Sequence, residues 1–163
     1  MISKELVEML TRQIRMEGDA RQFYLSASIW CKTRGLDGTA HFFNMQSEEE
    51  HGHMMKIINF LIDVGEKPVL PALEAPKNDF KNYRDLFETS LKYEKEVTES
   101  FHAMANKCQE VKDHTTLNFL QWFIEEQVEE EDLFRSILDK LDLIGETGTS
   151  IYLLDKELGS RQE

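Results

Sequence analysis

The sequence has little cysteine, little proline, a deficit of positive charge and no long hydrophobic run. Its only cysteines, Cys31 and Cys108, are too few and too far apart for a disulfide framework or a thiolate metal site. The N-terminal residues lack the apolar core of a signal peptide, and no apolar run approaches the length of a membrane span. We therefore expect a protein of the reducing cytoplasm with no membrane partner.

The charge is strongly one-sided. The 163 residues include 31 Asp and Glu but only 19 Lys and Arg, which gives a formal net charge of -12. Such a protein repels phosphate backbones and anionic membranes, so we expect no nucleic-acid partner, although it can attract cations. The proportions of charged and hydrophobic residues, 31% and 40%, are ordinary for a globular chain, and we expect a single domain over residues 1–163.

All three prolines lie between residues 65 and 81, and elsewhere apolar residues recur at steps of three and four. This period predicts amphipathic helices over about 3–33, 37–64, 82–111, 115–144 and 149–158. Short turns after the first and third helices make each following helix return antiparallel. The fifth helix is too short to be stable alone, so it must pack on another element, such as a neighbouring subunit.

The segment 65–81 decides the topology. Its residues reach at most ~55 Å when extended, whereas a helix of 28 residues is ~42 Å long. The segment can therefore cross the whole bundle and start the third helix parallel to the second. These features predict an all-α four-helix bundle of the ferritin-like kind, with a long crossover between helices 2 and 3 and a short fifth C-terminal helix.

Each of the four long helices carries a carboxylate on its apolar stripe, and His53 lies one turn after Glu50 on nearly the same face. A buried carboxylate is costly unless a positive partner accompanies it, and no Lys or Arg arrives on these stripes. The simplest explanation is a metal site. Its candidate ligands are Glu17, Glu50, His53, Glu94, Gln127 and Glu130.

The two hairpins repeat this polar pattern. Adding 77 to the residue numbers of the first hairpin gives the polar stripe residues of the second. Each candidate also lies about 15 to 18 positions from its own turn, so antiparallel packing places them all at one depth. The related pairs are Glu17 with Glu94, Glu50 with Gln127, and His53 with Glu130.

Oxygen ligands with a nitrogen suit iron or manganese and also accept zinc. Helix bundles bind two metals with such a set, in which two helices each supply a Glu-x-x-His pair. Only Glu50 and His53 form that pair here, so we expect two inequivalent metals. The alternative, a solvated acidic face, is a poor explanation because these residues follow the same three- and four-residue spacing as the buried apolar residues.

An acidic run spans residues 125–131, and such a run is usually a solvated face. Some of its members, together with a glutamate of the second helix, are nevertheless spaced to hold a further cation beside the metal pair. The residues alone leave both interpretations open. The candidate ligands are Glu49, Glu126, Glu129 and Glu130.

Tyr24 lies two turns from Glu17 towards the hairpin turn and can reach the metal site. A phenol beside iron can donate an electron or a hydrogen bond, which would make Tyr24 a catalytic residue. A core tyrosine with a satisfied hydroxyl is the equally acceptable alternative.

Over essentially its full length the chain resembles bacterial non-haem ferritin. The similar segments are Glu17 with Tyr24, the Glu49-Glu50-x-x-His53 stretch, Glu94, residues 118–130 and residues 152–158. The resemblance implies a hollow shell of 24 subunits that oxidises Fe(II) with O2 or peroxide at an intrasubunit ferroxidase centre and stores ferric mineral. It also implies two iron ions at the six candidate ligands and a third iron at the four acidic residues named above.

The pattern departs from two other ferritin groups. Bacterioferritin supplies a Glu-x-x-His from each half, whereas the second half here has Gln127 and Glu130, so no haem is expected. Animal ferritins line a three-fold iron channel with two acidic residues at positions that are Leu117 and Leu120 here. These two positions therefore supply no acidic lining for a three-fold pore, and the sequence leaves the route of iron entry open.

Two further features stand out against the family pattern. Gly52 and Met55 replace carboxylates that animal chains use for mineral nucleation. The pair Gly18 and Asp19 lies beside a candidate ligand, and it predicts a local weakness in the first helix because an interior glycine costs roughly 1 kcal/mol.

Three other functions compete with iron storage. A small di-iron protein of the rubrerythrin or oxygenase kind would work without a shell. A DNA-protecting mini-ferritin would build its site across a subunit interface, whereas this sequence closes the site within one chain. A purely structural helical scaffold would not bind metal stoichiometrically.

Overall fold

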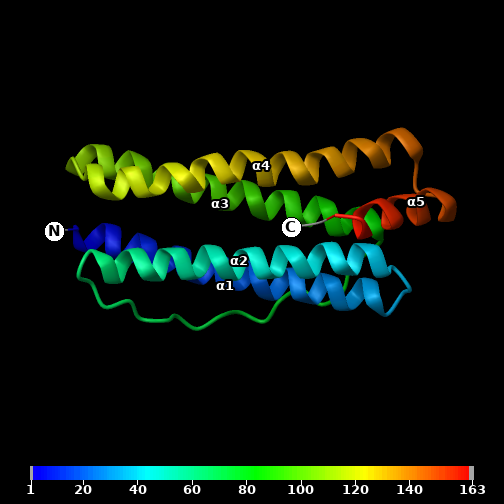
Figure 1. The fold of residues 1–163 in the computed structure, drawn as a ribbon, viewed down its shortest axis with the longest axis horizontal. Coiled ribbons are helices and arrows are strands. Elements are labelled where there is room, and N and C mark those ends of the chain that lie inside the picture. Colours follow the sequence, from blue (N-terminus) through cyan, green and yellow to red (C-terminus); the bar gives the residue numbers. More distant parts are fainter. Residues whose placement is uncertain (1, 162–163) are drawn as a thin grey trace.

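The structure, a computed structural model, describes residues 2–161, which form five helices and no strand. α1 (Lys4–Lys32) and α2 (Asp37–Asp63) make one antiparallel hairpin, and α3 (Tyr83–Val111) and α4 (His114–Ile144) make the second. The short α5 (Gly148–Gly159) follows. The two hairpins lie along the same long axis (Figure 1). The predicted all-α bundle is confirmed, and each helix begins and ends within one residue of its predicted bounds.

Local side chains start most of the helices. Ser3, Asn82, Asp113 and Thr147 each accept a hydrogen bond from a backbone N–H three residues further on, which satisfies one of the free donors of a first turn. α4 ends at Gly145, whose φ of 76° is a conformation that glycine adopts at little cost. Capping residues next to these helices therefore fix most of the N-terminal helix boundaries.

The crossover between α2 and α3 runs along the outside of the first hairpin (Figure 1). Gly18 gives it room, because a Cβ atom there would lie 2.7 Å from Cδ2 of Leu73. Asp19 accepts a hydrogen bond of 2.9 Å from the backbone N–H of Glu74, whose carboxylate pairs with Arg15. α1 passes through Gly18 without interruption, and Gly18 and Asp19 both contact the crossover.

α5 packs against the first turn of α2. That turn has no side-chain cap of its own. Asp155 of α5 supplies one, because its carboxylate accepts hydrogen bonds from the backbone N–H groups of Gly38 and Thr39 at 3.2 and 2.7 Å. The hydroxyl of Thr39 donates to the same carboxylate at 2.7 Å. The fifth helix thus packs on its own subunit and stabilises the start of α2.

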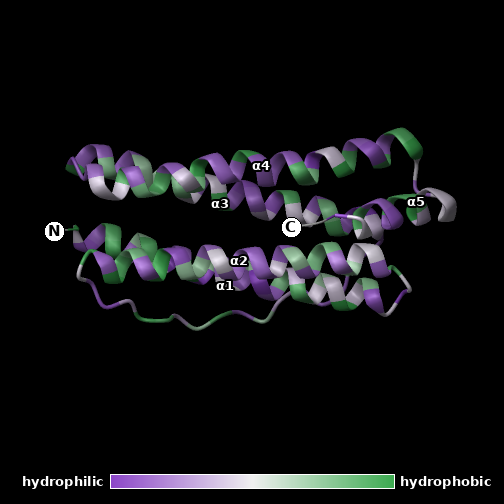
Figure 2. Ribbon diagram, in the orientation of Figure 1, coloured by the Kyte–Doolittle hydropathy of each residue, from purple (hydrophilic) through white to green (hydrophobic). Residues whose placement is uncertain are grey.

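A polar layer halfway along the bundle divides the core into two hydrophobic clusters, and hydrophobic and hydrophilic residues alternate along every long helix (Figure 2). The cluster nearer the 34–38 turn is rich in aromatic side chains, including Tyr24, Phe42, Phe43, Phe87 and Phe134. The other cluster is largely aliphatic, including Leu6, Leu10, Ile57, Leu61 and Met104. The polar layer is therefore enclosed at both ends by packed apolar side chains.

Several features named from the sequence have simple places in this fold. Cys31 and Cys108 are buried free thiols in opposite core clusters. Leu120 is fully buried and Leu117 packs against the same aliphatic cluster. Within residues 2–161, no helix combines the length and apolar character that crossing a membrane requires.

Candidate metal centre

The polar layer contains the six residues proposed as ligands of a metal pair. They come from all four long helices, and each is buried, with an exposed fraction between 1% and 5%. The 77-residue repeat places them at one depth because both hairpins are antiparallel and of similar length. In chain order they are Glu17 from α1, Glu50 and His53 from α2, Glu94 from α3, and Gln127 and Glu130 from α4.

The first hairpin forms one half of this site. Ligand atoms of Glu17, Glu50 and His53 lie within 4.8 Å of one another. Nδ1 of His53 is 3.1 Å from a carboxylate oxygen of Glu50 and 3.8 Å from one of Glu17. Gln13 donates a hydrogen bond of 2.6 Å to Oε1 of Glu17, while Oε2 of Glu17 is buried and has no hydrogen-bond partner within residues 2–161. A buried acceptor oxygen is thus left available for a cation.

The second hairpin forms the other half. Glu94 accepts hydrogen bonds on both carboxylate oxygens, from the hydroxyl of Tyr24 and from the side-chain amide of Gln127 at 3.1 Å. Glu130 accepts a hydrogen bond of 2.8 Å from the amide of Gln46. Each acidic group of this half is therefore oriented by neutral donors, without a cation.

The electrostatics of the layer reflect its burial. Burial and the nearby carboxylates raise the pKa of Glu50 well above its ordinary value. Burial raises the pKa of Glu94 to about 7, although its hydrogen bonds from Tyr24 and Gln127 act in the opposite direction. Burial, followed by the charge of Glu94, raises the pKa of Glu130 to about 8. These carboxyl groups therefore hold protons near neutral pH when no cation is bound.

Glu17 and His53 behave in the opposite way. Burial alone would raise the pKa of Glu17, but its interactions with His53 and Glu50 outweigh burial and lower it. Burial would likewise lower the pKa of His53, but its interactions with the carboxylates of Glu17 and Glu50 raise it to about 11. The imidazole is thus protonated in the cation-free protein and serves as the internal counter-charge of this half.

The donor set suits divalent cations. Among residues 2–161, no lysine or arginine forms an ion pair with Glu17, Glu50, Glu94 or Glu130, and His53 supplies the only partner charge. Cations bound at this layer would replace the protons held by the carboxyl groups and the imidazole. Oxygen ligands with one nitrogen match iron, manganese or zinc.

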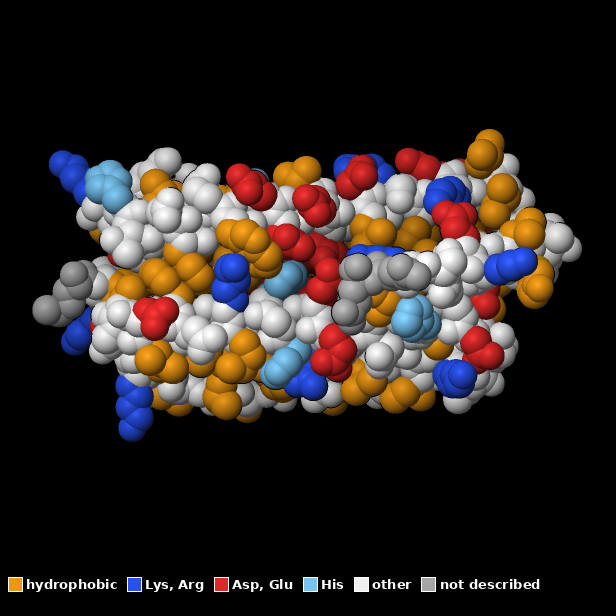
Figure 3. All heavy atoms as spheres, in the orientation of Figure 1, with side chains coloured by type: hydrophobic (Ala, Val, Ile, Leu, Met, Phe, Trp, Pro, Cys, Tyr) orange, Lys and Arg blue, Asp and Glu red, His pale blue; other side chains and the backbone are white. Residues whose placement is uncertain are grey.

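A second acidic cluster lies beside the first, between α2 and α4. Carboxylate oxygens of Glu49, Glu126 and Glu130 lie within 4.8 Å of one another. The adjoining cavity of about 180 Å³ is also lined by Glu129 and by Arg161. Acidic side chains gather halfway along this face of the molecule, between the two hairpins (Figure 3). The structure thus places all four predicted residues around one cavity and adds an arginine that sequence reasoning missed.

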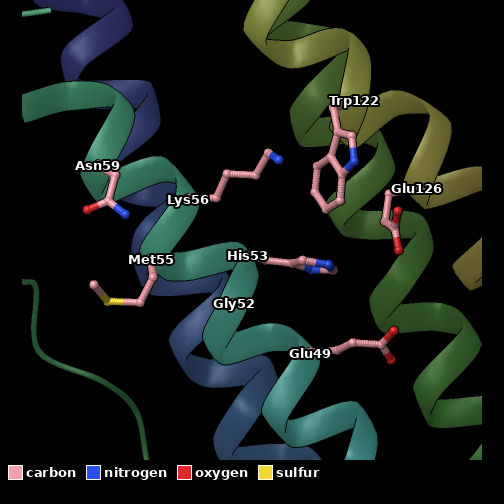
Figure 4. A pocket seen from close by; sticks show the side chains of 8 residues that line it. All are labelled: Glu49, Gly52, His53, Met55, Lys56, Asn59, Trp122 and Glu126. Atoms are coloured by element: carbon pink, nitrogen blue, oxygen red, sulfur yellow. The ribbon is translucent and has the colours of Figure 1, made fainter. Parts of the chain in front are cut away.

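A groove of about 500 Å³ approaches the same region from solvent (Figure 4). His53, Glu49 and Glu126 point into it. At its rim the ammonium group of Lys56 lies 3.8 Å from the centre of the Trp122 ring, and that ring is 5.5 Å from the imidazole of His53. Trp122 therefore lines the approach to the imidazole. Gly52 and Met55 also line this groove.

Sequence reasoning missed two buried amides that hold the ligands. Gln13 lies four residues before Glu17 and Gln46 lies four residues before Glu50, so each amide is one helical turn from a candidate ligand. Both glutamines are fully buried. Gln13 donates to the glutamate of its own helix, whereas Gln46 donates across the bundle to Glu130. The four-residue spacing was the available signal.

Comparisons with known proteins identify the family of this fold. The family model of the ferritin-like domain matches residues 7–144. A probable bacterial non-heme ferritin-like protein from Haemophilus influenzae is 41% identical over 160 residues, covering 98% of this chain and 97% of the relative. A bacterial non-heme ferritin from Campylobacter jejuni is 40% identical over 156 residues, covering 96% and 93% of the two chains.

Solved structures show the same likeness. An open-pore ferritin from the hyperthermophilic archaeon Archaeoglobus fulgidus superposes with a TM-score of 0.97 at 38% identity, covering 99% of each chain. A humanized archaeal ferritin gives a TM-score of 0.97 at 36% identity, covering 99% of this chain and 98% of the other. This chain belongs to the ferritin family.

Proposed function

We propose that the chain is the subunit of an iron-storage ferritin that oxidises Fe(II) with O2 or peroxide at a di-iron centre between its four long helices. The observation that carries this proposal is the buried polar layer, where four carboxyl groups and one imidazole converge without a lysine or arginine ion-paired to them in residues 2–161. The names of the relatives, bacterial non-heme ferritins, support iron as the cargo.

In this proposal Glu50 bridges two Fe(II) ions. Glu17 and His53, whose ligand atoms lie within 4.8 Å of those of Glu50, bind one ion. Glu94 and Glu130, the buried carboxyl groups of the second hairpin, bind the other. Each ion gives one electron to the oxidant, and the carboxylates stabilise the higher charge of the ferric products. The two ions are inequivalent because only one of them has a nitrogen ligand.

Tyr24 and Gln127 act on the second ion through Glu94. Their hydrogen bonds to the two oxygens of Glu94 hold that carboxylate in one orientation, which a metal ligand requires. Burial and the neighbouring carboxylates raise the pKa of Tyr24 well above its ordinary value, so the phenol stays protonated. It is therefore a hydrogen-bond donor at rest and can give up an electron together with its proton during oxidation.

A third cation binds at the second acidic cluster. Glu130 belongs to both sites, and Glu49, Glu126 and Glu129 complete the outer one around the cavity. The outer site binds a cation more weakly than the di-iron centre because its residues are more exposed and it lacks an imidazole. Its place beside the centre suits a cation on the way to the storage cavity.

We further propose that 24 copies assemble into a hollow shell that stores the ferric mineral, and the cytoplasm remains the predicted location. The match of the relatives over nearly their full length supports the assembly. So do large apolar side chains that the single subunit leaves exposed, because such side chains mark contact surfaces when they gather. They lie at the end of α4, on α5 and on the crossover: Leu143, Tyr152, Leu153, Val69 and Leu70.

An aerobic soak of protein crystals in Fe(II), with anomalous scattering at the iron edge, tests the site. We expect two iron peaks between the four helices and a weaker third peak at the outer cluster. Crystals soaked in parallel with Zn²⁺ control for oxidation. If the iron soak leaves no density between these side chains, the proposed centre is wrong.

Size-exclusion chromatography of the same protein tests storage. A large hollow particle that retains ferric iron is expected. A monomer or dimer with iron at the centre would favour a small di-iron enzyme that works without a shell.

A further inference from the structure

Arg161 follows α5 and extends back over α2 to the outer acidic cluster. Its backbone N–H donates to the carbonyl of Leu158 at 3.3 Å, and its guanidinium lies 5.1 Å from the centre of the Phe42 ring. The side chain is about two-thirds buried, and it lines the 180 Å³ cavity together with the glutamates of the outer cluster. Arg161 is the only lysine or arginine among the described residues that line this cavity.

The guanidinium makes one strong contact and one weak contact in this cavity. Nη1 donates a hydrogen bond of 2.6 Å to Oε1 of Gln46. Nη2 is 3.6 Å from Oε2 of Glu49, which is too long for a hydrogen bond. That oxygen is buried and accepts no hydrogen bond within residues 2–161. Arg161 is therefore anchored at Gln46 and leaves the oxygen of Glu49 available to a cation.

The anchor also connects Arg161 to the di-iron centre. An arginine can only donate, so it requires the carbonyl oxygen of Gln46 to face it. The amide nitrogen of Gln46 then faces Glu130 and donates to its carboxylate at 2.8 Å. Arg161 thereby fixes the orientation of the amide that holds the carboxylate shared by both sites.

We infer that Arg161 is a positioning residue and the resident counter-charge of the outer cation site, so that a third cation binds against its positive charge. This inference rests on the proposed third cation. With the site empty, the guanidinium balances the acidic cluster. When a divalent cation enters, Arg161 gives up the weak contact with Glu49 but stays anchored at Gln46, and its charge lowers the affinity. A cation held in this way leaves readily, which suits transfer to a storage cavity.

Titration of the metal-free protein with Zn²⁺, followed by calorimetry, tests this role without iron oxidation. The outer contact is partly exposed, so we expect Arg161→Gln to tighten the third binding step by about fivefold. The first two steps should change less than the third, because Glu130 is the only inner ligand held by the amide that Arg161 orients. Release of the third Zn²⁺ to a chelator should slow by a similar factor.

Two control variants separate the local charge from general effects. Arg12→Gln removes the same charge from an exposed arginine of α1 and should behave as the parent. Arg161→Lys retains the charge and should keep the third step within about twofold of the parent. An Arg161→Gln variant whose third step equals that of the parent, or is weaker, would overturn the inference, and so would an Arg161→Lys variant that binds as tightly as Arg161→Gln.

The parent titration separates this inference from the proposed function. Uptake of only two Zn²⁺ per subunit would overturn both the third cation and the role of Arg161, and would leave the di-iron centre standing. Three steps in the parent, with identical constants in Arg161→Gln, would overturn the role of Arg161 alone.

Discussion

The two hairpins carry the same spacing of polar residues, but they manage buried charge in opposite ways. In the α1–α2 hairpin the imidazole of His53 lies beside Glu17 and Glu50, and its pKa is raised to about 11, so this half contains its own counter-charge. The α3–α4 hairpin has a carboxyl group in place of the imidazole. Burial raises the pKa of its Glu94 to about 7 and that of Glu130 to about 8, so this half relies on protons.

This difference explains how one bundle tolerates four buried carboxyl groups before a cation arrives. The ion pair of Glu17 with His53 and the proton held by Glu50 in one half, together with the protonated acids of the other half, remove most of the net charge from the layer. The two halves should therefore respond differently to pH and to substitution, although their ligands lie at the same depth.

Glu50 belongs to both halves, because as a bridge it would bind both ions. Glu50→Ala should therefore have the largest effect, and we expect fast Fe(II) oxidation to fall by at least ~100-fold while circular dichroism shows an intact bundle. Rapid mixing with Fe(II) in aerated buffer, followed by ferric absorbance, measures the rate. The matched control is Glu48→Ala, which removes an exposed glutamate of α2. Oxidation by Glu50→Ala at the parent rate would refute the ligand assignment.

Tyr24 acts on the second half alone, through its hydrogen bond to Glu94. Tyr24→Phe leaves one oxygen of that carboxylate without a donor, so we expect oxidation to slow by about tenfold while two metals still bind. The control is Tyr93→Phe, because the hydroxyl of Tyr93 donates to the backbone carbonyl of Met16 and not to a ligand. Equal rates in the two variants would leave Tyr24 as a packing residue.

Replacing Glu94 with Gln tests the claim that the second half relies on protons. The native protein keeps a proton on Glu94 that the unfolded chain loses, because its pKa is raised from 4.5 to about 7. The contribution of Glu94 to the free energy of unfolding is therefore fully present below pH 4.5 and is lost as pH rises through about 7.

In the metal-free protein at pH 8, Glu94→Gln should thus increase the free energy of unfolding by roughly 1 kcal/mol, after allowance for the hydrogen bonds that Glu94 accepts. At pH 5 the gain should vanish, and metal binding should be weaker at both pH values. Chemical denaturation of the parent, Glu94→Gln and the exposed control Glu96→Gln at the two pH values measures this difference. A Glu94→Gln protein that is clearly less stable than the parent at pH 8 would contradict the comparison.

The fold and the inner layer could be predicted from sequence because both depend on period. Apolar spacing fixes the helices, and the 77-residue repeat places Glu17 and Glu94 at one depth. Helix ends could also be predicted, because capping residues such as Ser3 act on the first turn of their own helix.

Contacts between distant segments left no such signal. The sequence alone predicts a weak point at Gly18, and only the structure shows that Leu73 of the crossover lies against it. Arg161 lies beyond the last helix, and its contact with Gln46 depends on where α5 places the end of the chain. These contacts depend on tertiary packing, which local propensity does not encode.

The outer cluster joins the two hairpins, because Glu49 comes from α2 while Glu126 and Glu129 come from α4. Glu49→Ala or Glu129→Ala should leave the first two Fe(II) sites filled, and each should change the number of Fe(II) oxidised per O2 or the rate at which the centre clears. We expect the smaller change from Glu129→Ala. The side chain of Glu129 is exposed and only lines the cavity, whereas a carboxylate oxygen of Glu49 lies within 4.8 Å of one of Glu126.

Rapid mixing and O2 consumption over repeated iron additions measure these effects, which should be the smallest of the series because the outer site is more solvated than the inner one. Glu48→Ala again controls for the loss of one acidic group from α2. Traces of both variants that overlay the parent through every addition would show that the outer cluster has no function. A loss of the first oxidation phase in Glu49→Ala would show instead that the two clusters act as one site, because Glu49 would then support the binding of the first two ions.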